Sequence, residues 1–335
     1  MDLFIGSHYD VGLQIGRKFK NTINKFLVQE YSLIILNNVT NVHSYYSMIC
    51  EYCPQYLDEI RGIAVGANIE FMYLFIYMCY ECWENHHNGC TDVIVADHAT
   101  QNRTTIVAHT NDEYQRHQGY VLIYRIKTPD EPELLVVTTA GFIINVAVNA
   151  AGLCFTGNYL SSNDQRSEGV PRTMIYRTLI GSYSIDNVID IVSAMPRASA
   201  ENYVITTATK KINIECSAKN FTIVEIDDLY AHTNHFTVPE MLKYEKYINA
   251  YTSQKRLSRI YSLLNSNYGR LTPKLVAQLI MDHGDGDEQS AICRHTTEST
   301  TIFSIIVELE TQQIIYSCGH PCERRSINLP FPKLL

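Results

Sequence analysis

The sequence lacks long apolar runs, is poor in glycine and proline, and contains no basic stripe. Its most apolar stretch, residues 71–80, is far shorter than the roughly 20 residues of a membrane-spanning helix, so we expect no membrane segment. The 335 residues include 16 Gly and 10 Pro, and 46% are hydrophobic, which excludes a fibrous or disordered chain. A net charge of -8 without a basic patch argues against a nucleic-acid partner.

Targeting signals are also missing. Residues 1–6 lack the basic segment and apolar core of a secretory leader. Ten cysteines in a chain without such a leader predict free thiols in a reducing compartment, so we expect a cytoplasmic protein. The ending Lys333-Leu334-Leu335 resembles a peroxisomal Ser-Lys-Leu signal only loosely.

Standard catalytic and metal motifs do not occur. There is no GxSxG elbow, no GxxxxGK[ST] loop and no GxGxxG after a strand. The acidic segment 282–288 has the wrong register for a calcium loop. The pairs His86/His87 and His232/His235 have no HExxH context. We therefore expect no bound metal and no cofactor.

Closely spaced cysteines leave one alternative open. Three such pairs are present: Cys50/Cys53, Cys79/Cys82 and Cys318/Cys322. Two CxxC pairs are a zinc pattern, but the segment between them is longer than usual and has an apolar helical composition. Buried thiols are therefore the favoured interpretation, and a non-catalytic, zinc-binding scaffold is the alternative.

Hydrophobic periodicity predicts a helical first part of the chain. Helices are expected over residues 10–31, from about residue 54 to 63, and over 69–84. Short β-rich runs follow after Gly89, in the pattern of an antiparallel meander: 91–96, 104–109, 120–126, 134–138, 143–149 and 152–158. The change from helical periodicity to short β-rich runs near residue 90 fits either a domain boundary or one domain whose first helices pack onto a later sheet.

The remaining chain alternates between blocks of helices and strands. Helices are expected over 172–181 and 185–194, strands over 203–208, 212–217 and 221–226, helices within 239–282, and strands over 301–308 and 313–317. Blocks in this order predict a layered α+β fold and not a doubly wound parallel sheet.

The segment Gly89-Cys90-Thr91 carries the most specific chemistry. It lies where the helical part ends and the first strand begins. Gly89 lacks a Cβ, so its peptide can adopt a strained backbone that exposes its carbonyl to the Cys90 sulfur. Cleavage at this peptide bond would give Cys90 a free α-amine with an unperturbed pKa of about 7.7–8.0, which suits a general base for the thiol. Taken alone, the motif also fits a cysteine buried at the start of a strand.

Eight short motifs in order support the first interpretation: 59–64 with Gly66, 89–91, 139–143, 149–152, 169–172, 232–235, 292–295 and 319–321. With these motifs the chain resembles the acyl-coenzyme A:6-aminopenicillanic acid acyltransferase (isopenicillin N acyltransferase) family of Ntn hydrolases, which includes insect hydrolases of β-alanyl amines. The resemblance implies one αββα sandwich over residues 1–335. It also implies that a zymogen cleaves itself between Gly89 and Cys90 into an α chain (1–89) and a β chain (90–335) that stay together as a heterodimer.

The resemblance also implies roles for single residues. Cys90 matches the nucleophile, and Asn234 matches the residue whose amide stabilises the oxyanion. Arg294 matches an active-site arginine that can orient a carboxylate. Asp112 matches the active-site acid less closely.

The departure from the family lies around that acid. The chain reads Thr110-Asn111-Asp112 where the acyltransferase has Asn-Trp-Asp, and a shift by one residue would place Glu113 there and restore Asn111. The choice between Asp112 and Glu113 therefore stays open.

The expected function is amide hydrolysis through a Cys90 thioester, with a small linear N-acyl or β-alanyl amine as substrate. An acyl-CoA-dependent N-acyltransferase would use the same acyl-enzyme, with acyl-CoA as a co-substrate. The two differ only in the donor and acceptor of the acyl group.

Overall fold

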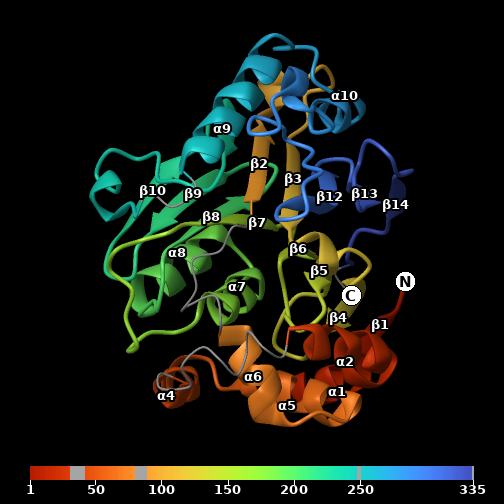
Figure 1. Ribbon diagram of the computed structural model, residues 1–335, viewed down its shortest axis with the longest axis vertical. Helices are drawn as coiled ribbons and strands as arrows, with labels where there is room; N and C mark the ends of the chain where they lie inside the picture. Colours follow the sequence, from red (N-terminus) through yellow and green to blue (C-terminus); the bar gives the residue numbers. More distant parts are fainter. Residues whose placement is uncertain (31–41, 80–88, 247–249, 334–335) are drawn as a thin grey trace.

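Two β-sheets lie face to face between layers of helices in the computed structural model, which describes residues 1–30, 42–79, 89–246 and 250–333 (Figure 1). The helices in these residues are α1 (His8–Lys18), α2 (Lys20–Gln29), α4 (Val42–Tyr52), α5 (Gln55–Ala67), α6 (Phe71–Cys79), α7 (Arg172–Ile180), α8 (Ile185–Ala194), α9 (Ala250–Asn265) and α10 (Pro273–Leu279). None of them is long and apolar enough to cross a bilayer.

The larger sheet has eight strands in the order β1-β4-β5-β6-β7-β8-β9-β10. Their bounds are β1 (Leu3–Ile5), β4 (Val121–Lys127), β5 (Leu134–Thr139), β6 (Val146–Asn149), β7 (Cys154–Tyr159), β8 (Glu201–Thr206), β9 (Lys211–Cys216) and β10 (Phe221–Glu225). Neighbouring strands are antiparallel except β1, which runs parallel to β4.

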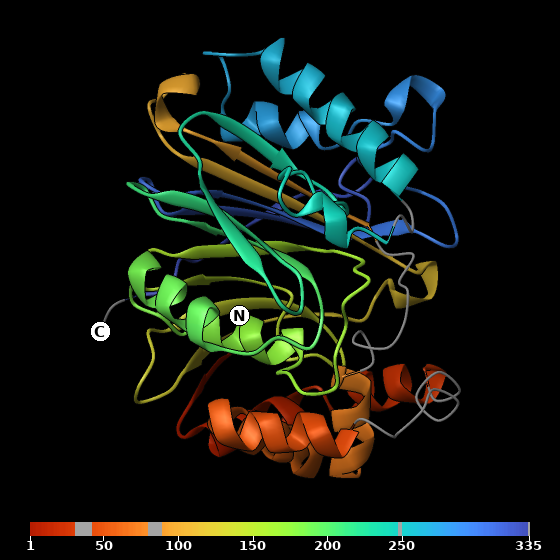
Figure 2. The same cartoon turned by 90° about the vertical axis from the view of Figure 1, so that its left-hand side faces the viewer.

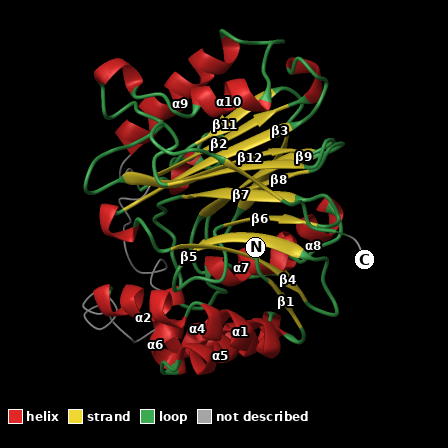
Figure 3. Ribbon diagram, turned by 90° about the vertical axis from the view of Figure 1, so that its right-hand side faces the viewer, coloured by secondary structure: helices red, strands yellow, loops and turns green. Residues whose placement is uncertain are grey.

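The smaller sheet has six strands in the order β11-β2-β3-β12-β13-β14, all antiparallel. Their bounds are β2 (Gly89–Val95), β3 (Ile106–Glu113), β11 (Leu229–His232), β12 (Thr300–Glu308), β13 (Gln313–Cys318) and β14 (Ile327–Leu329). Figures 2 and 3 show α9 and α10 over the outer face of this sheet, and the remaining helices on the far side of the larger sheet. The α+β prediction is confirmed.

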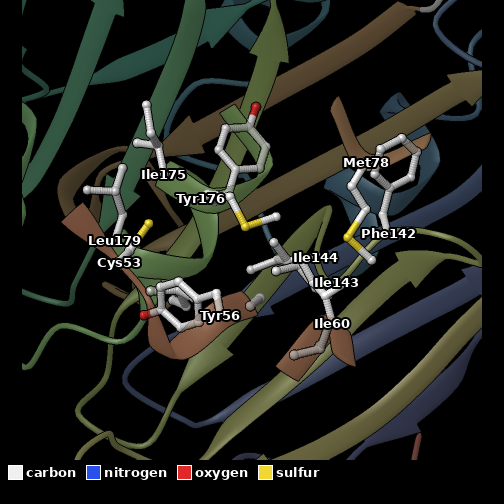
Figure 4. Close-up of a cluster of buried hydrophobic side chains, with 14 of the residues drawn as sticks. Cys53, Tyr56, Ile60, Met78, Phe142, Ile143, Ile144, Ile175, Tyr176 and Leu179 are labelled. Atoms are coloured by element: carbon white, nitrogen blue, oxygen red, sulfur yellow. The ribbon is translucent and has the colours of Figure 1, made fainter. Parts of the chain in front are cut away.

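Side-chain alternation along the strands explains this layering. In β4, Leu122, Tyr124 and Ile126 are buried, while the residues between them are partly exposed. These three side chains join a core with the N-terminal helices and with α7 and α8. Figure 4 shows part of that core, where Tyr56 of α5 lies near Leu179 of α7, and Ile60 of α5 lies near Ile143. The first helices thus pack directly onto the larger sheet.

The meander predicted over residues 91–158 is only partly right. Strands β2 and β3 belong to the smaller sheet, whereas β4 to β7 form a meander in the larger one. Between β3 and β4 the chain passes through a short 3-10 turn, Gln115–His117, and through Gly119 at φ +86. This turn carries the chain from one sheet to the other, which no local pattern in the strands could indicate.

The single helix predicted over residues 10–31 is wrong in one respect. The chain breaks at Phe19, whose φ of -104 and ψ of 17 lie between α1 and α2. The Phe19 ring packs edge-on against Phe4 and also contacts Tyr124. Of the helix predicted over 69–84, the structure shows 71–79, and residues 80–84 lie outside the described residues.

Helix α4 and the short strands β1, β11 and β14 were not predicted individually. The three strands have three or four residues each. Such segments are too short for alternation to identify them, and they form because a neighbouring strand supplies hydrogen bonds.

Candidate active site

The β2–β3 hairpin positions the predicted nucleophile. Cys90 pairs with Asn111 across the two strands, and Gly89 pairs with Asp112. Because side chains alternate along a strand, these two pairs face opposite sides of the sheet. Cys90 and Asn111 line a cavity that also borders β7, β8 and α7. Gly89 and Asp112 face the layer that contains α9.

The Cys90 thiol is buried, with 9% of the residue exposed. Its Sγ lies 3.9 Å from Asn111 Oδ1. Burial raises the pKa of the Cys90 thiol well above its usual value, and nearby carboxylates, Asp112 first among them, raise it further. The thiol is therefore protonated at neutral pH in the uncleaved chain, so its reactivity requires a base or a new positive charge nearby.

Gly89 stands where no side chain fits. A Cβ at this position would lie 2.9 Å from Asp112 Oδ2, 3.0 Å from Arg294 Nη1 and 3.3 Å from Arg256 Nη2. Gly89 is an ordinary strand residue and is not among those with positive φ. The strained backbone expected here is therefore wrong, and a side chain at this position would instead crowd the ends of three charged side chains.

Arg256, on α9, holds the main chain of the nucleophile. Its Nη1 donates hydrogen bonds to Cys90 O (2.7 Å) and Thr91 Oγ1 (3.0 Å), and its Nη2 donates to Asn234 Oδ1 (2.8 Å). Burial lowers the pKa of Arg256 to about 10, and the nearby Arg294 adds to this effect. A guanidinium is the group that can bridge three acceptors from one fixed plane.

Asn234 follows directly on β11 and faces Cys90 with its oxygen. Its Oδ1 accepts hydrogen bonds from the Cys90 main-chain N–H (2.9 Å) and from Arg256, while its Nδ2 donates to Tyr159 O (3.2 Å). The structure thus brings Asn234 to Cys90 as expected. In the uncleaved chain its oxygen orients the nitrogen that cleavage would turn into an amine.

Asp112 and Glu113 lie on opposite faces of β3. Asp112 accepts a hydrogen bond from Thr301 Oγ1 (2.6 Å), and its other oxygen is beside Gly89. Burial raises the pKa of Asp112, although Arg294 and Arg256 partly oppose this effect. Glu113 lines the cavity and forms an ion pair with His117 Nδ1 (3.3 Å). Asp112 is therefore the carboxylate next to the Gly89–Cys90 peptide, whereas Glu113 lines the cavity.

Arg294 is brought to the same place by the chain entering β12. Its main-chain N–H donates to Thr301 Oγ1 (2.9 Å), and its carbonyl accepts from Thr301 N (3.0 Å). This anchoring directs the guanidinium to Gly89. Thr110 pairs with Thr91 one step further along the hairpin and does not line the cavity.

The cavity in front of Cys90 has a volume of about 30 Å³ in the uncleaved chain. It is lined by polar and apolar side chains together: Cys90, Asn111, Glu113, Phe142, Ile144, Asn145, Gly157, Tyr159, Arg172, Thr173, Tyr176 and Glu201. Arg172 Nη1 and Glu201 form a buried ion pair at 2.6 Å in its wall. Asn111 lines the same cavity as the thiol, and its Nδ2 is buried without a hydrogen-bond acceptor among the described residues. It is therefore available to a developing oxyanion.

Sequence reasoning missed Arg256 and the Arg172–Glu201 pair. A signal for Arg256 exists, since Ser253, Arg256 and Ile260 share the spacing of the buried face of α9. A charged residue at such a position indicates a buried partner. Arg172 belongs to the motif 169–172, which carried no assigned role, and no comparable signal marks Glu201.

The zinc alternative based on the CxxC pairs finds no support in the described residues. Cys53 and Cys79 are buried, Cys50 is exposed, and Cys82 lies outside the described residues together with His86 and His87. The groups of potential metal ligands within the described ranges do not include Cys50, Cys53 or Cys79.

Comparisons with known proteins identify the family of the chain. Residues 98–323 match the family described as acyl-coenzyme A:6-aminopenicillanic acid acyl-transferase. The chain is 27% identical over 223 residues to the beta-alanyl-dopamine/carcinine hydrolase of Drosophila melanogaster, a match that spans 56% of the chain and 55% of that protein. It is 24% identical over 283 residues to the 40 kDa form of acyl-coenzyme A:6-aminopenicillanic-acid-acyltransferase of Emericella nidulans, spanning 80% of the chain and 76% of that protein.

Among solved structures, a conjugated bile acid hydrolase from Clostridium perfringens superposes with a TM-score of 0.51 at 10% identity. The match covers 72% of this chain and 92% of that one. At such low identity the likeness concerns the fold alone. The fold is the αββα sandwich of the Ntn hydrolases, as predicted.

Proposed function

Because the chain belongs to the acyl-coenzyme A:6-aminopenicillanic acid acyl-transferase family, we propose that it is a self-processing cysteine Ntn hydrolase with Cys90 as nucleophile. One observation carries this proposal. The Gly89–Cys90 peptide lies between Asp112 and the guanidinium groups of Arg294 and Arg256, while the Cys90 thiol opens onto a cavity. A cysteine buried for packing alone would require neither feature.

Self-cleavage begins with attack of Cys90 Sγ on the Gly89 carbonyl carbon. The C–N bond breaks as the acyl group moves to sulfur, and the former amide nitrogen takes up the thiol proton to become an amine. Water then hydrolyses the thioester, which frees the thiol and leaves a carboxylate on Gly89. The guanidinium groups of Arg294 and Arg256 beside Gly89 supply electrostatic stabilisation as the oxyanion forms.

The mature enzyme uses the new α-amine as its base. The amine takes the thiol proton, and its positive charge offsets the carboxylates that raise the thiol pKa in the uncleaved chain. Asn234 Oδ1, already bonded to this nitrogen, keeps it oriented toward the sulfur. The amides of Asn111 and Asn234 are the donors proposed for the oxyanion. This cycle uses groups of the chain itself and needs no cofactor.

The proposed substrate is a small linear amide of the N-acyl amine or β-alanyl amine type. The polar wall that contains Glu113, Arg172 and Glu201 favours a compact polar acyl group over a bulky apolar one. The similarity to an insect β-alanyl-amine hydrolase supports the same class. The thiolate attacks the amide carbonyl, the amine leaves with a proton, and water releases the acid from the thioester.

An acyltransferase is the second candidate, and the longer match to the fungal enzyme favours it. Acyl-CoA would then load Cys90, and an amine in place of water would accept the acyl group. Both reactions pass through the same thioester, so the acceptor decides between them.

We propose that residues 1–89 and 90–335 stay associated after cleavage as α and β chains. Strand β1 pairs with β4, and one apolar core contains side chains from both parts. Separation would expose this core to water.

Intact mass spectrometry of the purified full-length chain tests the proposal. We expect two masses, for residues 1–89 and 90–335, whose sum exceeds the full chain by one water. Cys90→Ala should remain a single chain, whereas Cys154→Ala, which removes a buried thiol away from the cavity, should cleave as wild type does. A single full-length chain in all three samples would contradict self-processing.

Assays of the cleaved enzyme then distinguish the hydrolase from the acyltransferase. Amine release from a β-alanyl amine in buffer, absent in Cys90→Ala, would identify a hydrolase. Transfer to an added amine from acyl-CoA, without amide hydrolysis, would identify an acyltransferase.

A further inference from the structure

Four side chains that could hold a metal ion gather outside the cavity, where the chain between α10 and β12 meets the segment after β13. They are His283, Cys293, His295 and Cys322, and their ligand atoms all lie within 4.8 Å of one another. No two of them have the short C-x-x-C spacing that identifies zinc sites in sequences, so the tertiary fold alone assembles the group.

The three distances among Cys293, Cys322 and His295 match tetrahedral metal coordination. Cys293 Sγ lies 3.6 Å from Cys322 Sγ and 3.5 Å from His295 Nε2, and Cys322 Sγ lies 3.3 Å from the same nitrogen. Bonds to Zn²⁺ of about 2.3 Å from sulfur and about 2.0–2.1 Å from nitrogen place two sulfurs about 3.8 Å apart and a sulfur and a nitrogen about 3.6 Å apart. The fourth member, His283, stacks edge-on against His295 with ring centroids 5.1 Å apart.

Two simpler explanations, a hydrogen bond and a disulfide, account for fewer of these contacts. One S–H···N hydrogen bond would bring one sulfur to His295 Nε2, but here both sulfurs contact that nitrogen and each other. A disulfide between Cys293 and Cys322 would need an S–S bond of about 2.05 Å. Their separation of 3.6 Å is too long for this bond and agrees with two thiolates on one ion.

Two polar side chains, Glu323 and His320, lie next to His295. Its other ring nitrogen, Nδ1, lies 3.7 Å from Glu323 Oε1, as in the carboxylate–histidine–zinc arrangement. Glu323 also contacts His320 Nδ1 (3.0 Å), and His320 Nε2 is within hydrogen-bonding distance of Thr300 Oγ1 (2.7 Å). Both nitrogens of His320 are thus engaged, so His320 and Glu323 support the ligands and do not form a second site.

We propose that His283, Cys293, His295 and Cys322 bind one structural Zn²⁺. Two thiolates and two imidazoles satisfy the coordination of zinc, and four protein ligands leave no position for a substrate. This proposal differs from the expectation of a metal-free protein, which noted Cys322 only as the partner of Cys318 and did not connect it with Cys293, His283 or His295. Because Arg294 directly follows Cys293, the ion would fix the chain on which this active-site arginine stands.

Metal analysis of the full-length protein, purified under reducing conditions after growth with added zinc, tests the proposal. We expect one zinc per chain, and at least about tenfold less in Cys322→Ser and Cys293→Ser, because each variant loses a ligand. Cys318→Ser is the matched control, since this cysteine is exposed on the same segment and lies outside the group, and it should retain the zinc. Glu323→Gln should bind zinc about tenfold more weakly while keeping the stoichiometry.

Cobalt substitution tests the site in the wild-type chain, so the result does not depend on whether the variants fold. Co²⁺ should give the intense visible bands of a tetrahedral thiolate site, which added Zn²⁺ should abolish. Wild-type protein without stoichiometric zinc and without these bands would overturn the proposal. An equal loss of zinc in Cys318→Ser, or a Cys293–Cys322 disulfide in the reduced preparation, would also overturn it. None of these results depends on whether the chain cleaves itself.

Discussion

Arg256 shows how much of the site depends on one buried side chain. It is nearly inaccessible, with 1% exposed, and binds main-chain and side-chain acceptors around Cys90. Its Nη2 and the Cys90 N–H share the same oxygen of Asn234. Arg256 therefore positions both Cys90, the proposed nucleophile, and Asn234.

Replacing Arg256 with Lys should slow self-cleavage by about tenfold or more, because a single ammonium cannot reproduce the planar fork that holds three acceptors. The rate is measured by following the two fragments from a freshly translated or refolded chain. Lys255→Gln is the control, since Lys255 lies on the adjacent, partly exposed position and pairs with Asp287. Wild-type cleavage in Arg256→Lys would show that the guanidinium has no positioning role.

At the scale of elements, the contact between α1 and α5 depends on glycines. A Cβ at Gly62 would lie 2.2 Å from Tyr9 O, and one at Gly12 would lie 2.0 Å from Glu59 O. Gly16 and Gly66 are equally crowded against the opposite backbone. The glycines in the motif around residues 59–66 are thus required because two helices touch backbone to backbone.

Gly62→Ala should destabilise the protein by about 2 kcal/mol or more, because the methyl group forces the helices apart. Helix propensity alone would predict the opposite sign, a gain of about 1 kcal/mol. Urea unfolding distinguishes the two. Val65→Ala on the exposed face of α5 is the control and should change stability by less than about 0.5 kcal/mol. A neutral or stabilising Gly62→Ala would mean that the helices can move apart freely.

At the scale of the whole molecule, a charged cluster links the N-terminal helices to the hairpin that carries Cys90. His117 contacts Glu30 (3.1 Å) at the end of α2 and Glu113 (3.3 Å) at the end of β3. Burial by itself lowers the pKa of His117, but Glu113 and Glu30 raise it to about 9. Burial by itself raises the pKa of Glu30, but His117 and Arg116 lower it to about 2.

These shifts predict the pH dependence of stability. The contribution of His117 to the free energy of unfolding is complete below its unfolded pKa of 6.5 and is lost as pH rises toward 9. The Glu30 contribution is complete above 4.5 and is lost as pH falls toward 2. The free energy of unfolding contributed by the cluster is therefore greatest between pH 4.5 and 6.5.

Urea unfolding of Cys90→Ala in reducing buffer at pH 6 and pH 9 measures this effect without cleavage. Adding His117→Gln should reduce the loss of stability between these pH values by on the order of 2 kcal/mol. The comparison of the two chains removes the contribution of other titrating groups. Equal pH dependence with and without His117 would contradict the raised pKa.

Much of the fold was predictable because its signals are local. Apolar periodicity placed α5, α7 and α8 and most of the longer strands, and the block order indicated α+β layers. The Gly89-Cys90-Thr91 motif, which the sequence placed at the start of a strand, does begin β2 and contains the proposed nucleophile. Such features depend on neighbours in the chain, so the sequence by itself determines them.

The partners of Cys90 were settled by the tertiary structure. The family resemblance named Asn234 and Arg294, but not Arg256. Asn234 lies just after β11, Arg256 on α9 and Arg294 before β12, and sheet pairing and helix packing bring them to one peptide bond. The same holds for Cys293 and Cys322, which meet across the chain. Contacts between distant segments leave no local pattern, because each residue alone is compatible with an ordinary surface or core position.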